Sequence, residues 1–276
     1  AQWENQNSTT GYQEGDYIEY DFIRRELKDW KSAQINVFAN YKFSENSKIE
    51  FSYDILEYEN YTSYNAIFDE ETLNIPRDIF TEKESPFSVR VGKMDFESLL
   101  LKKIDFTAGF KYVKSDFSNN NSVNIDDQIQ EEYTNRSLLD EFIVAGYSQA
   151  NFDLSKKIKI QAGLRYEYTD TFVHSSQGDT FVDRDYGNLF PSLFFGYKIN
   201  DFNNLNLSYS KRISRPAFTD MAPMLIFLDL NTAAFGNLSL RPAFSKNYQI
   251  DYRYKSIGLS AQYSNENDVF ARFSPS

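Results

Sequence analysis

The 276-residue chain carries a formal net charge of −11 and has a mean hydropathy of −0.57, although 17% of its residues are aromatic. The acidic balance argues against a nucleic acid as partner, because affinity for phosphates comes from clustered lysine and arginine. The lack of cysteine excludes disulfides and thiolate metal sites, and no apolar run approaches the about 18 to 20 residues of a membrane-spanning helix.

The chain is polar overall but contains 25 Phe and 20 Tyr. So many aromatic side chains are not explained by the core of a soluble protein. A membrane β-barrel provides one, because its outer face and both membrane interfaces carry rings while its inner face stays polar. The composition therefore favours an all-β membrane protein.

The predicted elements begin after an acidic, aromatic stretch at residues 11–30, which we interpret as an extracellular loop. Period-two alternation then predicts about ten strands and no helix, since every second side chain of a strand lies on the same face. In residues 158–169 every even position is Ile, Ala, Leu or Tyr, and every odd position is Lys, Gln, Gly, Arg, Glu or Thr. The other predicted strands cover residues 33–43, 48–55, 87–96, 103–112, 141–154, 191–199, 205–212, 247–254 and 257–264.

The connections between these strands alternate between short and long. Short ones are expected near residues 44–47, 97–102, 155–157, 200–204 and 255–256. Long ones are expected at residues 57–86, 115–138, 171–188 and 214–245. An antiparallel up-and-down transmembrane β-barrel has this pattern, with tight periplasmic turns and long extracellular loops.

Alternation by itself also fits a soluble antiparallel sheet with one wet face. Two features favour the membrane. The apolar faces end in Tyr and Phe near the loops, and the polar faces hold charged residues among Gly and Ser, as a water-filled lumen requires. No linker or low-complexity tract divides the chain, so residues 1–276 are expected to form a single β-barrel segment.

Four stretches carry a family resemblance between about residues 88 and 268. They are QAGLRYEYT at 161–169, LFPSLFFGY at 189–197, LSYSKRISRP at 207–216 and FGNLSLRP at 235–242. In this order they resemble the outer-membrane β-barrel family of TonB-dependent receptor-type proteins. The family form of the last stretch is G-N-P-x-L-x-P, from which this chain departs only at Leu238.

The resemblance implies a barrel of about 22 strands with a plug in its lumen, driven through TonB. About ten strands and their loops occupy the whole chain, so we expect a barrel segment without a plug domain; a complete small barrel is the alternative. The implied partners are outer-membrane lipid, an unknown solute, and the TonB complex through a plug outside this chain. The implied location is the bacterial outer membrane, and no cofactor is expected.

Architecture accounts for most residues of the last two motifs. Pro216 interrupts ladder pairing where a strand passes into a loop, Gly236 and Asn237 form a turn pair able to take positive φ, and Pro242 fixes the entry to the next strand. Leu240 keeps the family pattern.

The candidate solute contacts lie in the same long connection. Arg212 and Arg215 can pair with acids of the plug or barrel, or hold an anionic solute. Apolar residues of this connection can contact the solute or form the loop's own small core: Phe218, Met221, Met224 and Phe227.

Enzymatic chemistry finds little support. The single histidine, His174, falls in a predicted loop without partners for a metal site or a Ser-His-Asp arrangement. Acidic clusters at residues 69–71 and 126–127 are typical of solvated loops or weak Ca²⁺ ligands. The hypotheses carried forward are a TonB-dependent transporter, a plugless porin or surface binding or structural β protein (including a soluble sandwich), and an enzyme at the barrel rim.

Overall fold

The computed structural model describes residues 2–13, 16–68, 78–101, 103–221, 225–227, 233–237 and 240–270. Within these ranges thirteen strands form one antiparallel sheet and two more form a separate hairpin. No helix in these ranges is long and apolar enough to cross a membrane. The strands are β1 (Gln2–Gln13), β2 (Asp16–Ser44), β3 (Ser47–Phe68), β4 (Asp78–Glu84), β5 (Phe87–Leu100), β6 (Ile104–Ile125), β7 (Gln128–Ile129), β8 (Asn135–Ser155), β9 (Ile158–Ser175), β10 (Thr180–Asn200), β11 (Asn203–Ser214), β12 (Leu225–Phe227), β13 (Ala233–Phe235), β14 (Ala243–Tyr254) and β15 (Ile257–Asn267).

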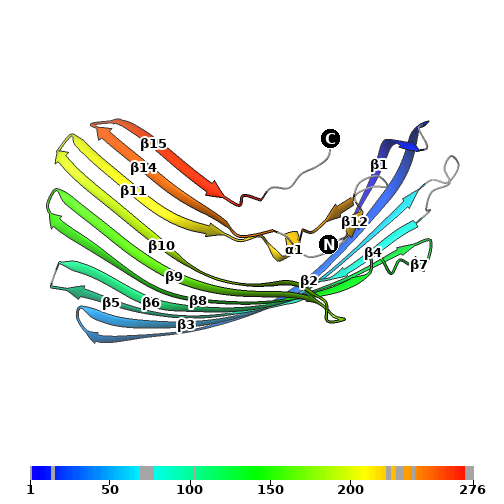
Figure 1. Ribbon diagram of the computed structural model, residues 1–276, viewed down its shortest axis with the longest axis horizontal. Helices are drawn as coiled ribbons and strands as arrows, with labels where there is room; N and C mark the ends of the chain where they lie inside the picture. Colours follow the sequence, from blue (N-terminus) through cyan, green and yellow to red (C-terminus); the bar gives the residue numbers. More distant parts are fainter. Residues whose placement is uncertain are drawn as a thin grey trace.

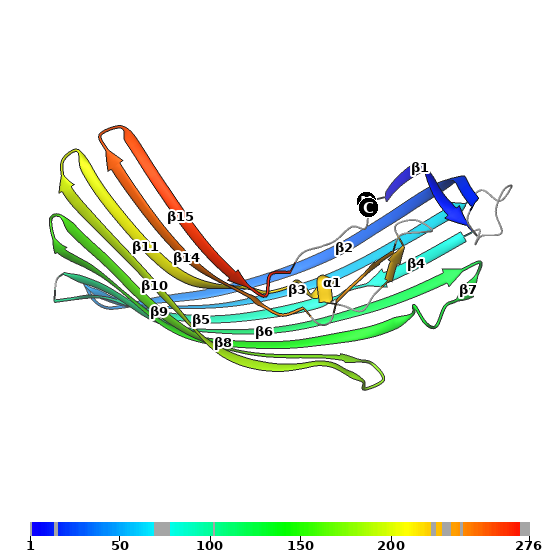
Figure 2. The same cartoon turned by 45° about the horizontal axis from the view of Figure 1, so that its top comes forward.

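Strand order follows chain order across the sheet, so the fold is an up-and-down meander. β4 and β5 together occupy the place between β3 and β6, with β5 at the short-turn end and β4 beyond it. The sheet is curved into an open trough with one concave and one convex face (Figures 1 and 2). This confirms the predicted all-β architecture of a barrel wall.

Cross-strand register keeps the two side-chain sets apart. Ile160 of β9 lies opposite Phe152 of β8 and Phe195 of β10, whereas Gln161 lies opposite Asn151 and Phe194. Because successive residues of a strand point to opposite faces, each apolar set forms continuous rows over one face of the sheet. The alternation seen in the sequence is thus a property of the whole sheet.

Five short turns join ten strands at one end of the trough, as predicted, and the longer connections lie at the other end (Figure 1). Three predicted long loops and the predicted loop at residues 11–30 are wrong, because much of each is strand. The sheet extends beyond the expected strand ends in four places, formed by the pairs β1 and β2, β3 and β4, β6 and β8, and β9 and β10. In these extensions the convex positions become polar, as at Asp116, Ser118 and Asn120, while the concave positions mix polar and apolar residues. The period-two contrast therefore fades while the backbone ladder continues.

The fourth long segment is a true connection, between β11 and β14. It contains a single helical turn, α1 (Phe218–Met221), and the β12–β13 hairpin, so the expectation of no helix is wrong by one turn. α1 and β12 lie on the concave side of the sheet (Figure 2). A small apolar cluster joins the connection to the sheet: Leu139, Val173, Val182 and Met221 are buried, with Phe117, Phe218 and Leu240 packed against them.

Candidate functional site

The convex face of the sheet is apolar. Along each strand, the side chains of this face alternate with those of the concave face, which touch the β11–β14 connection. Many side chains of the convex face are large and exposed: Ile35 (59% exposed), Val37 (54%), Leu193 (49%) and Leu259 (67%). Contiguous exposed apolar surface of this kind marks contact with lipid or protein. On β6 and β8 the apolar rows end in charges, where Lys114 lies 2.9 Å from Asp116 and 3.2 Å from Asp140.

The concave face is polar along the same strands. Tyr147 of β8 donates a hydrogen bond to the Asp95 carboxylate of β5, and Lys93 Nζ lies 2.5 Å from that carboxylate. The Arg165 guanidinium lies 5.8 Å from the centre of the Tyr147 ring. Cations and acids therefore neutralise one another on the face that would line a barrel lumen.

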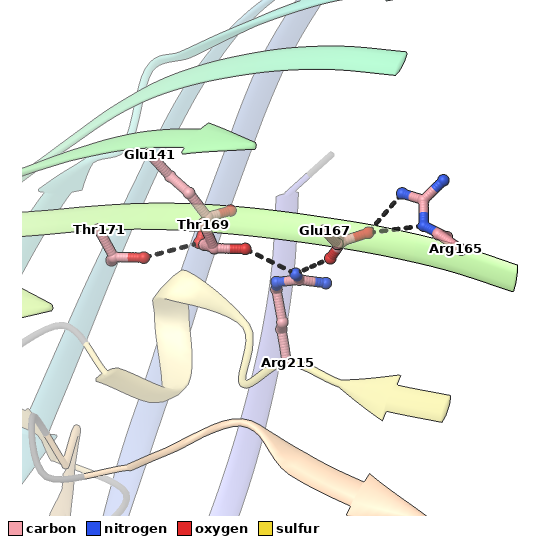
Figure 3. Close-up of polar contacts among 6 residues, drawn as sticks. All are labelled: Glu141, Arg165, Glu167, Thr169, Thr171 and Arg215. Carbon is pink, nitrogen blue, oxygen red and sulfur yellow. Dashed lines mark hydrogen bonds and ion pairs between the residues drawn. The ribbon is translucent and has the colours of Figure 1, made fainter. Parts of the chain in front are cut away.

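Arg215 connects this polar face to the β11–β14 connection (Figure 3). Its guanidinium forms an ion pair with Glu167 of β9 and donates a hydrogen bond of 2.9 Å to Thr169 Oγ1. Glu167 is 5% exposed, and its second carboxylate oxygen accepts from Arg165 Nε at 2.9 Å. A carboxylate held between two guanidiniums is a strong, geometrically fixed contact, so it fastens the start of the connection to β9.

Glu141 of β8 lies next to this cluster and beside Asp140, where the apolar rows of the convex face end in charges. Thr171 Oγ1 donates to its carboxylate at 3.1 Å. Burial raises the pKa of Glu141, although Arg215 and the Thr171 hydrogen bond act in the opposite direction.

The predicted solute contacts divide into two groups. Arg215, Phe218 and Met221 meet on the concave face, the first through Glu167 and the other two through the apolar cluster. Arg212 lies exposed on β11 and away from that cluster. Phe227 lies in β12, and Met224 falls outside the described residues.

The motif residues have structural positions. Pro216 directly follows Arg215 at the start of the connection, and Pro242 is buried just before β14. Leu240 packs on the apolar cluster, and its carbonyl accepts a hydrogen bond of 3.0 Å from Arg184 Nη1. Neither Gly236 nor Asn237 takes a positive φ. Asn237 instead donates its backbone N–H to the Asp220 carbonyl at 2.8 Å, which ties the end of α1 to the returning chain.

Two residues that sequence reasoning did not single out, Glu167 and Thr169, hold Arg215. The available signal was the polar parity of residues 158–169, which already placed both on the lumenal face. What the sequence did not reveal was that the β11–β14 connection would fold back over β9.

His174 also differs from expectation, since it lies in β9 rather than in a loop. Its ring centre is 4.9 Å from that of Phe172. Within the described ranges, no group of three or more His, Cys, Asp or Glu residues could hold a metal ion.

Comparison with known proteins agrees with this architecture. The profile of the outer membrane protein beta-barrel family matches residues 7–275. The ferric-catecholate import receptor Fiu from E. coli K12, in its closed form, is 10% identical with a TM-score of 0.58 over 95% of this chain and 50% of that one. The unliganded ferric citrate transporter FecA is 12% identical with a TM-score of 0.50 over 90% of this chain and 34% of that one. No curated protein matches the sequence. The chain thus spans half the length of Fiu and about a third of FecA.

Proposed function

Because the chain belongs to the outer membrane protein beta-barrel family and lies in the outer membrane, we propose that it forms part of a TonB-dependent transporter for a scarce, large solute. In this proposal the plug that contacts TonB belongs to the whole protein, and the present chain supplies barrel wall and one long extracellular connection. The role is transport, not catalysis.

The observation that carries the proposal is the fastening of that connection to the concave face. A passive pore needs an open lumen, whereas Arg215 and Glu167 hold the β11–β14 connection over the wall of this one. Solutes that are scarce and large are taken up through barrels whose lumen is obstructed and opened on demand, because an open pore of that width would leak. The names of the two similar structures, an import receptor and a transporter, support the same class of function.

The test is uptake in the native host. Deleting the gene should abolish uptake of at least one labelled solute from a panel of ferric chelates, corrinoids, oligosaccharides and peptides. Deleting TonB, or dissipating the proton gradient, should cause the same loss. Uptake that persists without TonB would contradict the proposal.

The second candidate is a plugless porin, which the continuous polar concave face favours. Conductance of the whole protein in a planar lipid bilayer separates the two. A steady open conductance of the porin type supports this alternative, whereas a closed channel supports the transporter.

A further inference from the structure

Five aromatic rings form a single row on the concave face, near the extracellular end. Trp30 of β2 stacks on Tyr58 of β3 with ring centres 5.5 Å apart, Tyr58 on Phe87 of β5 at 4.7 Å, and Phe87 on Phe117 of β6 at 5.0 Å. The row ends at Phe218 of α1, 5.4 Å from Phe117. Tyr58, Phe87 and Phe117 lie directly opposite one another in register, so the sheet itself holds the rings in line.

The two ends of the row differ. Trp30 is 61% exposed, whereas the Phe117 end continues into the buried apolar cluster under the β11–β14 connection. The row therefore leads from open solvent to the covered part of the concave face.

A row of uncharged polar residues runs beside the rings, one inward-facing position further along each strand. Ser85 Oγ, just after β4, donates to Asn119 Oδ1 of β6 at 2.9 Å. Asn119 lies directly opposite Ser137 of β8, and the two are 1% and 0% exposed. In the part of the chain that the structure describes, Asn119 Nδ2 and Ser137 Oγ have no hydrogen-bond partner.

The next inward-facing positions repeat this character. Asn121 of β6 is 3% exposed; its amide donates to the Tyr133 carbonyl at 3.0 Å, and its Oδ1 has no partner among the described residues. Lys83 of β4 lies opposite Asn121 and provides a further donor. Buried polar atoms in native proteins are almost always satisfied, so unpartnered donors and an acceptor gathered beside a ring row point to a polar ligand.

The combination identifies the ligand chemistry. A saccharide presents C–H groups on the faces of its rings, which are attracted to the negative face of an aromatic ring, and hydroxyls that both donate and accept. Amide and hydroxyl side chains match those hydroxyls without charge. An anionic chelate would instead require several free guanidinium or ammonium groups. Arg165 and Arg215 are both bound to Glu167, and burial lowers the pKa of Lys83, which favours its neutral form.

We propose that the aromatic row from Trp30 to Phe117, with Asn119 and Ser137 beside it, is a saccharide-binding site on the extracellular side of the lumen. The inference rests on the proposed transport function and identifies the transported solute as a saccharide. Trp30 and Tyr58 receive the solute, and the polar row fixes its orientation beneath the connection.

The test is binding to the whole protein in detergent or nanodiscs. The probes are the neutral oligosaccharides maltoheptaose, cellohexaose, xylohexaose and mannohexaose, measured by calorimetry and by quenching of tryptophan fluorescence. At least one should bind, and Trp30→Ala and Ser137→Ala should each weaken it at least tenfold. Phe202→Ala, which removes an exposed ring at the opposite end of the sheet, should leave the affinity unchanged. Because Trp30 is exposed and Ser137→Ala is nearly isosteric, both variants should still fold, which a gel-shift assay of heat modifiability checks.

Two results would overturn the inference. One is binding of none of these saccharides while a ferric catecholate binds equally to the wild type and to Trp30→Ala. The other is saccharide binding that neither variant changes. Neither result would contradict the proposed TonB-dependent transport. Saccharide binding without TonB-dependent uptake would contradict the proposed transport function but would support the binding site.

Discussion

Gly109 of β6 lies directly against the phenol ring of Tyr147 on β8: a Cβ atom at position 109 would stand 2.5 Å from Tyr147 Cζ. The same atom would stand 2.6 Å from an Asp95 carboxylate oxygen, the acceptor of the Tyr147 hydrogen bond. Three neighbouring strands thus meet at a contact that only glycine permits.

We expect Gly109→Ala to displace the Tyr147 ring and weaken its hydrogen bond to Asp95, lowering the free energy of unfolding by about 1–3 kcal/mol. Urea unfolding from lipid vesicles, followed by tryptophan fluorescence, measures this change. Gly146→Ala on β8 is the matched control, because a Cβ there meets nothing within 4 Å. Equal stability of the two variants would show that the ring moves aside without cost.

The Arg215 ion pair should control how tightly the β11–β14 connection is held. Arg215→Met leaves the buried Glu167 paired with Arg165 alone. Breaking a buried ion pair typically costs about 3–5 kcal/mol of stability. The cost here should be lower, because solvent near Arg215 screens part of the interaction. We expect faster chymotrypsin cleavage after Phe218 and Phe227, within the connection. Arg212→Met, which changes an exposed arginine on β11, should cleave at the wild-type rate. An unchanged rate for Arg215→Met would mean that the apolar cluster alone holds the connection.

Lys83 should make stability depend on pH at the alkaline end. Burial lowers the pKa of Lys83 below its ordinary 10.5, and its neighbours in register, Thr62 and Asn121, are neutral, while Glu82 and Glu84 point to the other face. The folded protein therefore binds fewer protons than the unfolded chain between the lowered pKa and 10.5, so stability rises with pH across that window.

It follows that Lys83→Met should raise Tm, and most at pH values below the lowered pKa, where folding buries the charged form. The gain should shrink as pH rises toward 10.5, where both states of the wild type become neutral at this position. Thermal unfolding of both proteins at pH 7 and pH 10 tests this. A gain that is the same at both pH values would assign the effect to packing rather than charge.

The sequence predicted the strands near the short turns because lipid and lumen impose opposite polarity on alternate residues, as at Ile160 and Gln161. It failed for the halves of β3, β6 and β9 away from the short turns. There polar residues such as Ser118 and Asn120 take the convex positions and apolar residues such as Val123 and Val173 occur on the concave face, so no polar–apolar contrast remains. The partners of Arg215 were equally inaccessible, since Glu167 lies 48 residues away and meets it only because the connection folds back. Likewise Tyr58, Phe87 and Phe117 align only through strand register, which periodicity alone does not specify.

The sidedness of the sheet can be tested on β9 alone. Leu164 is 49% exposed on the convex face, opposite Ser148 and Pro191, whereas Gln161 faces the lumen. Leu164→Arg places a charge in the hydrocarbon core and should cost about 2–4 kcal/mol, because no water or counter-charge reaches it there. Gln161→Arg adds the same side chain to a solvated wall and should change stability by about 0.5 kcal/mol or less. Equilibrium folding into lipid vesicles measures both. If the two substitutions cost the same, or Gln161→Arg costs more, the assignment of lipid to the convex face is wrong, and the transport proposal loses its basis.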